Sequence, residues 1–219
     1  MLLIPVAAAA LLFGSFKLFG TNESNNDNIA PSIKPNIVID FENAEMKGEV
    51  LHTNDQVLHT QNSPDDINIV DNIVREGKKS VLFTLQPDQS RRELRVLDIP
   101  NNSVKYISFS MYIPKEFEVP SNWSLFAQWW QGAPASPPIA FEFTPNTEEL
   151  QMRILTRSGI YQENNITVQY DAPIKKGEWI DFLVKLRIDD TGGNEGLLEV
   201  WENNKQIFNY KGKLGYTNL

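Results

Sequence analysis

The sequence predicts an all-β protein built as a sandwich of two sheets, and two observations support this fold class. The apolar runs are rich in Val, Ile, Phe, Tyr and Trp, which favour strands, and no long stretch has helical periodicity. Turn-forming Gly, Pro, Asn and Asp separate these runs at spacings typical of β-sandwiches. The chain has 219 residues, of which 41% are hydrophobic, enough to build the core of one large domain.

The first part of the chain is apolar. Residues 2–16, LLIPVAAAALLFGSF, form an uncharged run close in length to the core of a signal peptide and short for a membrane span. We therefore expect residues 1–20 to be a signal peptide or a membrane anchor. The protein is then secreted or membrane-anchored at a cell or particle surface, with any membrane association through residues 2–16. No basic segment precedes the run, so cleavage of the leader is left open.

A polar segment follows the apolar run. Residues 21–35, TNESNNDNIAPSIKP, are too polar to bury apolar surface and are expected to be a linker, with the folded domain spanning residues 36–219. The chain is rich in Asn, and its Asn-x-Ser/Thr sequences either carry glycans on surface loops or arise by chance. They begin at Asn22, Asn101, Asn122 and Asn165.

From residue 36 onward one strand is expected after another. The expected strands cover residues 36–42, 67–74, 80–86, 91–99, 104–113, 123–130, 138–144, 150–156, 166–172, 179–188, 197–204 and 206–211. Successive strand residues point to opposite faces of a sheet, so Arg91, Glu93 and Arg95 share one polar face. In the strand over 123–130, alternation groups Phe126 with Gln128 and Trp130, and Leu125 with Ala127 and Trp129.

Charge and composition restrict the possible partners and cofactors. The net charge of −8 argues against nucleic-acid binding, which needs a basic face. An acidic polysaccharide would need a local cluster of Arg and Lys, because exposed charges are screened over roughly 8 Å at physiological salt. The absence of Cys excludes disulfides and a Cys-ligated zinc site. Only His52 and His59 are present, in a polar segment, so neither a metal site nor a cofactor is expected.

Several segments resemble one family. Residues 67–86 followed by Arg91-Arg92-Glu93-Leu94-Arg95 resemble the heparin-lyase-like and alginate-lyase-like polysaccharide lyases, which have a concanavalin A-like jelly-roll fold. The segment Gln128-Trp129-Trp130-Gln131-Gly132, with Pro137-Pro138, is similar to the Gln-Trp-His-Gly and Pro-Pro segments of the family, with Trp130 in place of the His. Residues 177–181 and 196–204 resemble strands of the opposite sheet shared by concanavalin-like proteins.

The resemblance implies β-elimination on a uronic-acid polysaccharide. Arg91 and Arg95 would bind substrate carboxylates, Glu93 would orient Arg95, and Gln128 would help to neutralise the reacting uronate. The resemblance implies Tyr or His as the base and the acid. Indole has no acceptor lone pair, so Trp130 is either a platform for a sugar ring or a core residue.

Three questions stay open at this stage. Arg153 alternates away from its apolar neighbours and either adds positive charge to the binding face or is simply solvated. Tyr216 is either the catalytic Tyr of a shortened Tyr-x-Lys-x-Gly-x-Tyr motif, or part of the loop before a missing last strand. Arg91, Glu93 and Arg95 alone would also fit an exposed face with weak ion pairs. The functional hypotheses are therefore a lyase, or a non-catalytic carbohydrate-binding or surface structural protein.

Overall fold

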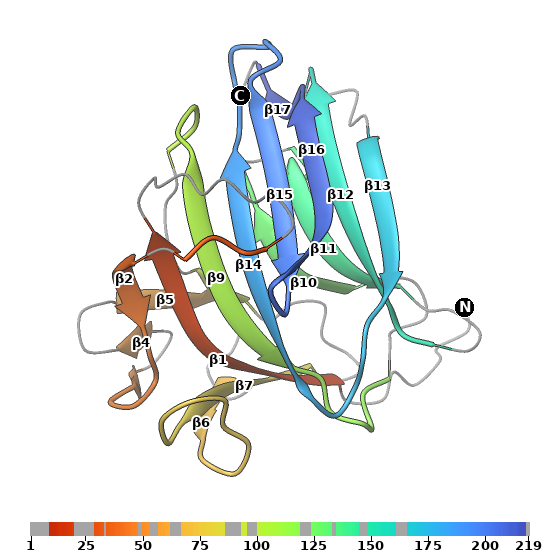
Figure 1. Cartoon of the computed structure of the whole chain (residues 1–219). Helices are drawn as coiled ribbons and strands as arrows, with labels where there is room; N and C mark the ends of the chain where they lie inside the picture. Colours follow the sequence, from red (N-terminus) through yellow and green to blue (C-terminus); the bar gives the residue numbers. More distant parts are fainter. Residues whose placement is uncertain are drawn as a thin grey trace, which may run out of the picture.

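The strands of the protein pack as two facing layers (Figure 1). The computed structural model describes residues 9–19, 29–32, 34–47, 50–52, 57–61, 67–85, 93–95, 100–118, 124–132, 135–144, 149–160 and 166–217. These residues form strands, turns and loops, and they include no α-helix. The predicted all-β sandwich is therefore confirmed.

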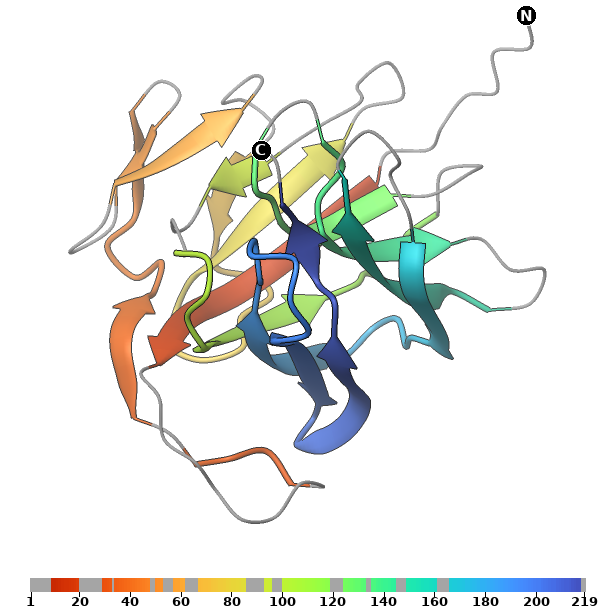
Figure 2. The same cartoon turned by 90° about the horizontal axis from the view of Figure 1, so that it is seen from above.

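One layer is an eight-stranded antiparallel sheet, here named the back sheet. Its strand order is β16-β15-β14-β9-β1-β7-β6, with β2 also paired to β1. The strands are β1 (Ala9–Phe19), β2 (Pro35–Ile39), β6 (Ile67–Val70), β7 (Ser80–Leu85), β9 (Lys105–Tyr112), β14 (Trp179–Arg187), β15 (Gly196–Glu202) and β16 (Lys205–Gly212). Figure 2 shows the blue strands of this sheet and the green to cyan strands of the other layer on separate sides of the molecule.

The other layer, here named the front layer, consists of two smaller sheets. The five-stranded sheet has the order β10-β11-β12-β13, with β17 paired in parallel to β12, and the four-stranded sheet has the order β3-β4-β5-β8. The strands are β3 (Glu45–Lys47), β4 (Val50–His52), β5 (Val57–Gln61), β8 (Glu93–Arg95), β10 (Ser124–Trp129), β11 (Ile139–Thr144), β12 (Gln151–Gly159), β13 (Ile166–Pro173) and β17 (Gly215–Tyr216). Both sheets contribute side chains to a single buried core that also includes the inner face of the back sheet.

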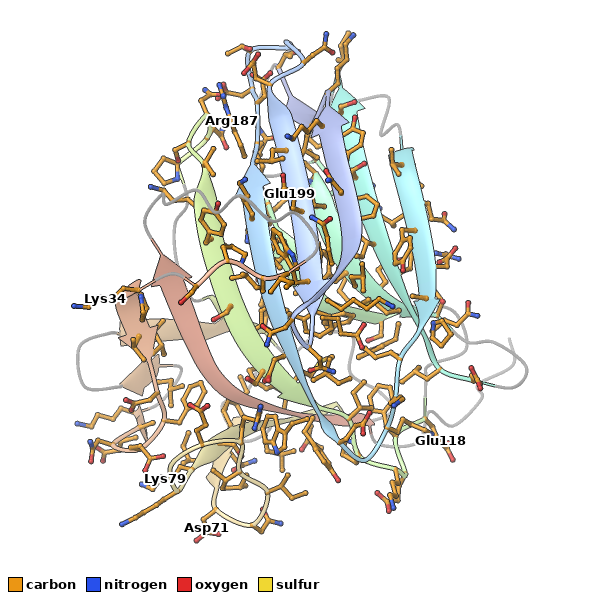
Figure 3. All side chains as sticks on the ribbon, in the orientation of Figure 1. Lys34, Asp71, Lys79, Glu118, Arg187 and Glu199 are labelled. Carbon is orange, nitrogen blue, oxygen red and sulfur yellow. The ribbon has the colours of Figure 1, made fainter. Side chains whose placement is uncertain are left out.

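Alternation along the back sheet produces this core. In β14, Ile180, Phe182 and Val184 are buried, while the residues between them are only half-buried. The ring of Phe182 lies 6.4 Å from that of Phe141 on β11, so the two layers meet at these aromatic side chains. Polar side chains lie on the outer surface of the sheet, where Figure 3 labels Arg187 and Glu199.

The described strands agree with the predicted ones from residue 36 onward, since each predicted segment overlaps an observed strand. The strands β1, β3, β4, β5 and β17 are additional. Strand β1 lies within the apolar segment that was expected to be a leader, and strands were expected only within residues 36–219. Strand β1 pairs with β2, β7 and β9. Whether this segment is removed or anchors the protein stays a prediction. The described residues contain no helix that is long and apolar enough to span a membrane.

One prediction of alternation is wrong, and a β-bulge is the reason. The pairing of β10 with β11 shifts its register between Leu125 and Ala127, so that Phe126 is an extra residue. The ring of Phe126 therefore stacks on Phe143 in the core at 4.6 Å, rather than sharing a face with Gln128. The alternation before the bulge therefore does not predict which face the residues after it occupy.

Candidate active site

The register of the four-stranded sheet groups several polar positions on one face. His59 pairs with Arg95 and Gln61 pairs with Glu93, and directly opposed residues of antiparallel strands share a face. His59 also pairs with Val50, the neighbour of Leu51, which is fully buried in the core. Because neighbouring strand residues alternate, these polar positions lie on the face that points away from the core. This face of the front layer is named the front face below.

A hydrogen bond connects this sheet to the five-stranded sheet. The amide Nε2 of Gln128 donates to Oε2 of Glu93 at 3.1 Å, and both side chains are half-buried. The edge strands β8 and β10 therefore meet at this bond. The predicted proximity of the Arg-x-Glu-Leu-Arg strand to Gln128 is thus seen for Glu93, while Arg91 and the side chain of Arg95 lie outside the described residues.

A row of charged residues crosses the five-stranded sheet beside Gln128. Glu142 on β11 pairs with Arg153 on β12, which pairs with Asp171 on β13. Nε of Arg153 donates to Oδ1 of Asp171 at 2.7 Å. Arg153 lies on the front face as alternation predicted, but its charge is shared with a carboxylate. Its role in binding substrate stays a prediction.

Glu142 is the most buried carboxyl group on the front face among the described residues. Only 7% of its surface is exposed, and it lies two positions along β11 from Ala140, the partner of Gln128. Burial raises the pKa of Glu142, and the positive charges of Arg157 and Arg153 oppose that rise. The front face therefore holds an acid that is harder to ionise than an exposed glutamate.

Tyr216 is packed inside the protein. Only 1% of its surface is exposed, and its hydroxyl has no hydrogen-bond partner among the described residues. Burial raises the pKa of Tyr216, and the charge of Arg157 acts in the opposite direction. Its backbone N–H donates to Oε1 of Gln131 at 2.7 Å. This environment is that of a structural side chain, and the catalytic role of Tyr216 stays a prediction.

The position of His59 opposite Arg95 could not be predicted from the sequence. His59 lies in a polar segment without a motif, and the short strands β4 and β5 have no pattern of alternation there. Its register opposite Arg95 comes only from the pairing of β5 with β8, two strands that are more than thirty positions apart in the sequence. Its companion His52 lies on the same face of the neighbouring strand β4, opposite Val57. No three His, Asp or Glu side chains of the described part of the chain come together as metal ligands.

The described strands form a β-sandwich whose front face carries the bond between Gln128 and Glu93 and the charged row through Arg153. The chain belongs to the polysaccharide lyase family, which matches residues 44–219. Its fold is similar to that of the endo-β-1,4-glucuronan lyase from the fungus Trichoderma reesei, with 17% sequence identity, a TM-score of 0.53 and coverage of 70% of each chain. No curated protein matches this chain.

Proposed function

We propose that this protein cleaves a uronic-acid polysaccharide by β-elimination on the front face of its front layer. The observation that carries the proposal is the hydrogen bond between Gln128 and Glu93, which brings the strand of Arg95 beside the strand of Gln128. Membership of the polysaccharide lyase family supports a polysaccharide substrate. The similar fold of a glucuronan lyase makes glucuronan the first polymer to test.

The chemistry explains why an amide and a guanidinium suit this face. In β-elimination a base removes the C5 proton of a uronate, a double bond forms between C4 and C5, and the C4–O bond breaks. The departing oxygen takes up a proton from water or from the protonated base. Negative charge builds on the carboxylate next to C5, and preorganised donors stabilise it. Gln128 has a second N–H beyond the one that it gives to Glu93, and Arg95 brings a permanent positive charge.

His59 is the proposed base. Histidine is the side chain whose ordinary pKa, about 6.5, allows it to accept a proton near neutral pH. The register of His59 opposite Arg95 puts it on the strand next to β8, on the same face as Glu93. Trp130 stands where the family has a His and cannot accept a proton. His59 on β5 would therefore serve as the base in place of the histidine that Trp130 replaces.

A second function is a carbohydrate-binding protein without catalysis. The observation that favours it is the burial of Tyr216, the tyrosine that the resemblance puts forward as acid or base. A hydroxyl with so little exposed surface is poorly accessible to a polymer, which argues against proton transfer by Tyr216. Binding without cleavage is therefore the competing outcome of the experiment.

The experiment incubates the purified protein separately with glucuronan, alginate and a glycosaminoglycan, and follows the ultraviolet absorbance of the unsaturated product. We expect product from at least one polymer. Gln128→Ala should lower kcat about 100- to 1000-fold, the usual loss when one donor to a developing anion is removed. Gln206→Ala is the matched control, because Gln206 is a half-buried amide on β16 of the back sheet.

The same assay tests the base. His59→Ala should lower kcat about 100- to 10,000-fold, whereas His52→Ala, on the next strand and out of register with Arg95, should lose far less. Product formation that is unaffected by Gln128→Ala would overturn the assignment of the site. Absence of product from every polymer, with retained binding, would replace the lyase by the binding protein.

A further inference from the structure

Trp130 follows the strand of the candidate active site and is exposed. It comes directly after β10, two positions beyond Gln128, and 48% of its surface is accessible. It is the only aromatic residue among the exposed large hydrophobic side chains of the described residues. The preceding Trp129 packs against Phe141 at 5.2 Å in the core, so the next side chain of an extended segment points outward.

The single polar atom of Trp130 already has a partner. Its Nε1–H donates to the carbonyl oxygen of Ala135 at 2.7 Å. Indole has no other donor and no acceptor, so Trp130 can neither transfer a proton nor hydrogen-bond a ligand. What it offers to solvent is the surface of its ring. Aromatic rings of this kind attract the polarised C–H groups on the apolar face of a sugar.

Hydrogen bonds hold the described residues that follow Trp130 at two places. Gln131 accepts the backbone N–H of Tyr216 and donates Nε2–H to its carbonyl oxygen at 3.3 Å. Arg157 on β12 donates through Nη1 to the carbonyl oxygen of Pro137 and through its backbone N–H to that of Pro138, both at 2.8 Å. The ring therefore needs little further ordering on binding, which favours affinity.

We infer that Trp130 is a stacking platform for a sugar residue next to the reacting uronate, and that it sets the dependence of binding on chain length. The inference rests on the proposed function for the polymer that it names. Two strand residues span about 7 Å, a distance of the order of one monosaccharide. The buried Tyr216 anchors the loop that holds this platform.

The test measures binding without turnover, by electrophoresis of the protein through gels that contain dissolved glucuronan. Trp130→Ala should weaken retardation, with an apparent Kd about five- to tenfold higher, whereas Trp130→Phe should keep most of the affinity because it keeps a ring. Both substitutions remove the hydrogen bond to Ala135, so a difference between them reports the ring alone. Ile160→Ala is the control, since Ile160 is an exposed apolar residue, at 44%, just beyond the end of β12.

Kinetics give the second readout. If the protein is a lyase, Trp130→Ala should raise KM for the polymer with little change in kcat, and oligosaccharides too short to reach the platform should show no difference. Equal retardation of Trp130→Ala and the unmodified protein would overturn the platform even where cleavage is found. Retardation that depends on Trp130 in a protein that forms no product would uphold the platform and overturn the lyase.

Discussion

Strands β14 and β10 lie in opposite layers and differ in their pattern of burial. In β14 of the back sheet buried and half-buried residues alternate without exception, whereas in β10 of the front layer every residue is half-buried. The bulge at Phe126 accounts for part of this difference, because it turns an extra aromatic ring into the core while Gln128 stays beside Glu93. Strand β14 therefore keeps the period of two expected of a strand, whereas β10, which carries part of the candidate site, departs from it.

The polar contacts of the two layers differ in the same way. On the outer face of β14, Asp181 accepts both hydrogen bonds of the Arg75 guanidinium, at 3.0 and 2.7 Å, together with one from the Ser110 hydroxyl. On the front face the bond between Gln128 and Glu93 joins two sheet edges and uses one of the two N–H groups of Gln128, while Arg153 pairs with Asp171. Asp181 thus accepts at least three hydrogen bonds from its neighbours, whereas the second N–H of Gln128 is the one that the proposed function gives to a ligand.

The largest loss of stability is expected on β14, where buried and half-buried residues alternate without exception. Phe182→Ala should lower the free energy of unfolding by about 3–5 kcal/mol, because it leaves a cavity at the contact between the layers. The Phe182 ring lies 5.2 Å from Phe109 within the back sheet and 6.1 Å from Phe126 on the bulge. Urea unfolding followed by circular dichroism measures the loss.

Leu183→Ala is the matched control for this prediction. Leu183 is the next residue on β14 and faces the other side of the sheet, where it is half-buried. Its loss should be clearly smaller, about 1 kcal/mol. Equal losses for the two variants would mean that the outer face of the back sheet is as closely packed as the core, and the contrast between the layers would weaken.

Most of the fold could be predicted because it depends on local patterns. The strand over 179–188 has apolar residues at every second position, the strand over 197–204 begins with a short, mainly apolar run, and turn residues separate the two. Strands β14 and β15 lie there. Strands β3, β4 and β5 have no such signal, since they are three to five residues long in a polar segment. Their pairing depends on neighbours distant in the chain, and a single sequence does not show it.

The turn between β14 and β15 offers a test of intermediate size. Asp189 is 2% exposed and accepts hydrogen bonds from the backbone N–H and the hydroxyl of Thr191, at 3.0 and 2.5 Å, and from the N–H of Glu195 at 3.1 Å. Asp189→Ala should reduce stability by about 1–3 kcal/mol, because it leaves three part-buried donors unpaired. Asp71→Ala, on an exposed loop labelled in Figure 3, should change stability by less than about 0.5 kcal/mol.

The effect of Asp189→Ala should depend on pH. The side-chain hydrogen bond from Thr191 lowers the pKa of Asp189 below its usual value. A depressed pKa means that the carboxylate stabilises the fold above the unfolded-state pKa of about 3.9 and loses this contribution as pH falls through the folded-state value. The gap between the protein and its variant should therefore narrow below about pH 4. A gap that stays constant would show that the charge of Asp189 is irrelevant to the turn.

The candidate site could be predicted only in part. The resemblance of the Arg-x-Glu-Leu-Arg and Gln-Trp-Trp segments predicted that their strands share one groove, with Glu93 orienting Arg95. The structure joins the two strands through a hydrogen bond between Gln128 and Glu93. The resemblance did not show that Arg153 is paired with Asp171, because that contact depends on the register of β12 with β13. The burial of Glu142 could not be predicted either. Glu142 lies between Phe141 and Phe143, so alternation predicts that it points away from the core into solvent.

Glu142→Gln should have the smallest effect on stability. Unlike Phe182→Ala and Asp189→Ala, it should stabilise the protein. The pKa of Glu142 is raised by burial, so above the folded-state pKa its charge opposes folding, and below the unfolded-state value of about 4.3 this penalty is absent. Glu142→Gln should therefore stabilise the protein at pH 7, and the gain should disappear near pH 4 in urea unfolding. Glu116→Gln, on an exposed loop, should show no such pH dependence. If Glu142→Gln instead destabilises the protein at pH 7, the attraction of Arg153 and Arg157 outweighs desolvation, and the front face is held together by its own charges as the back sheet is.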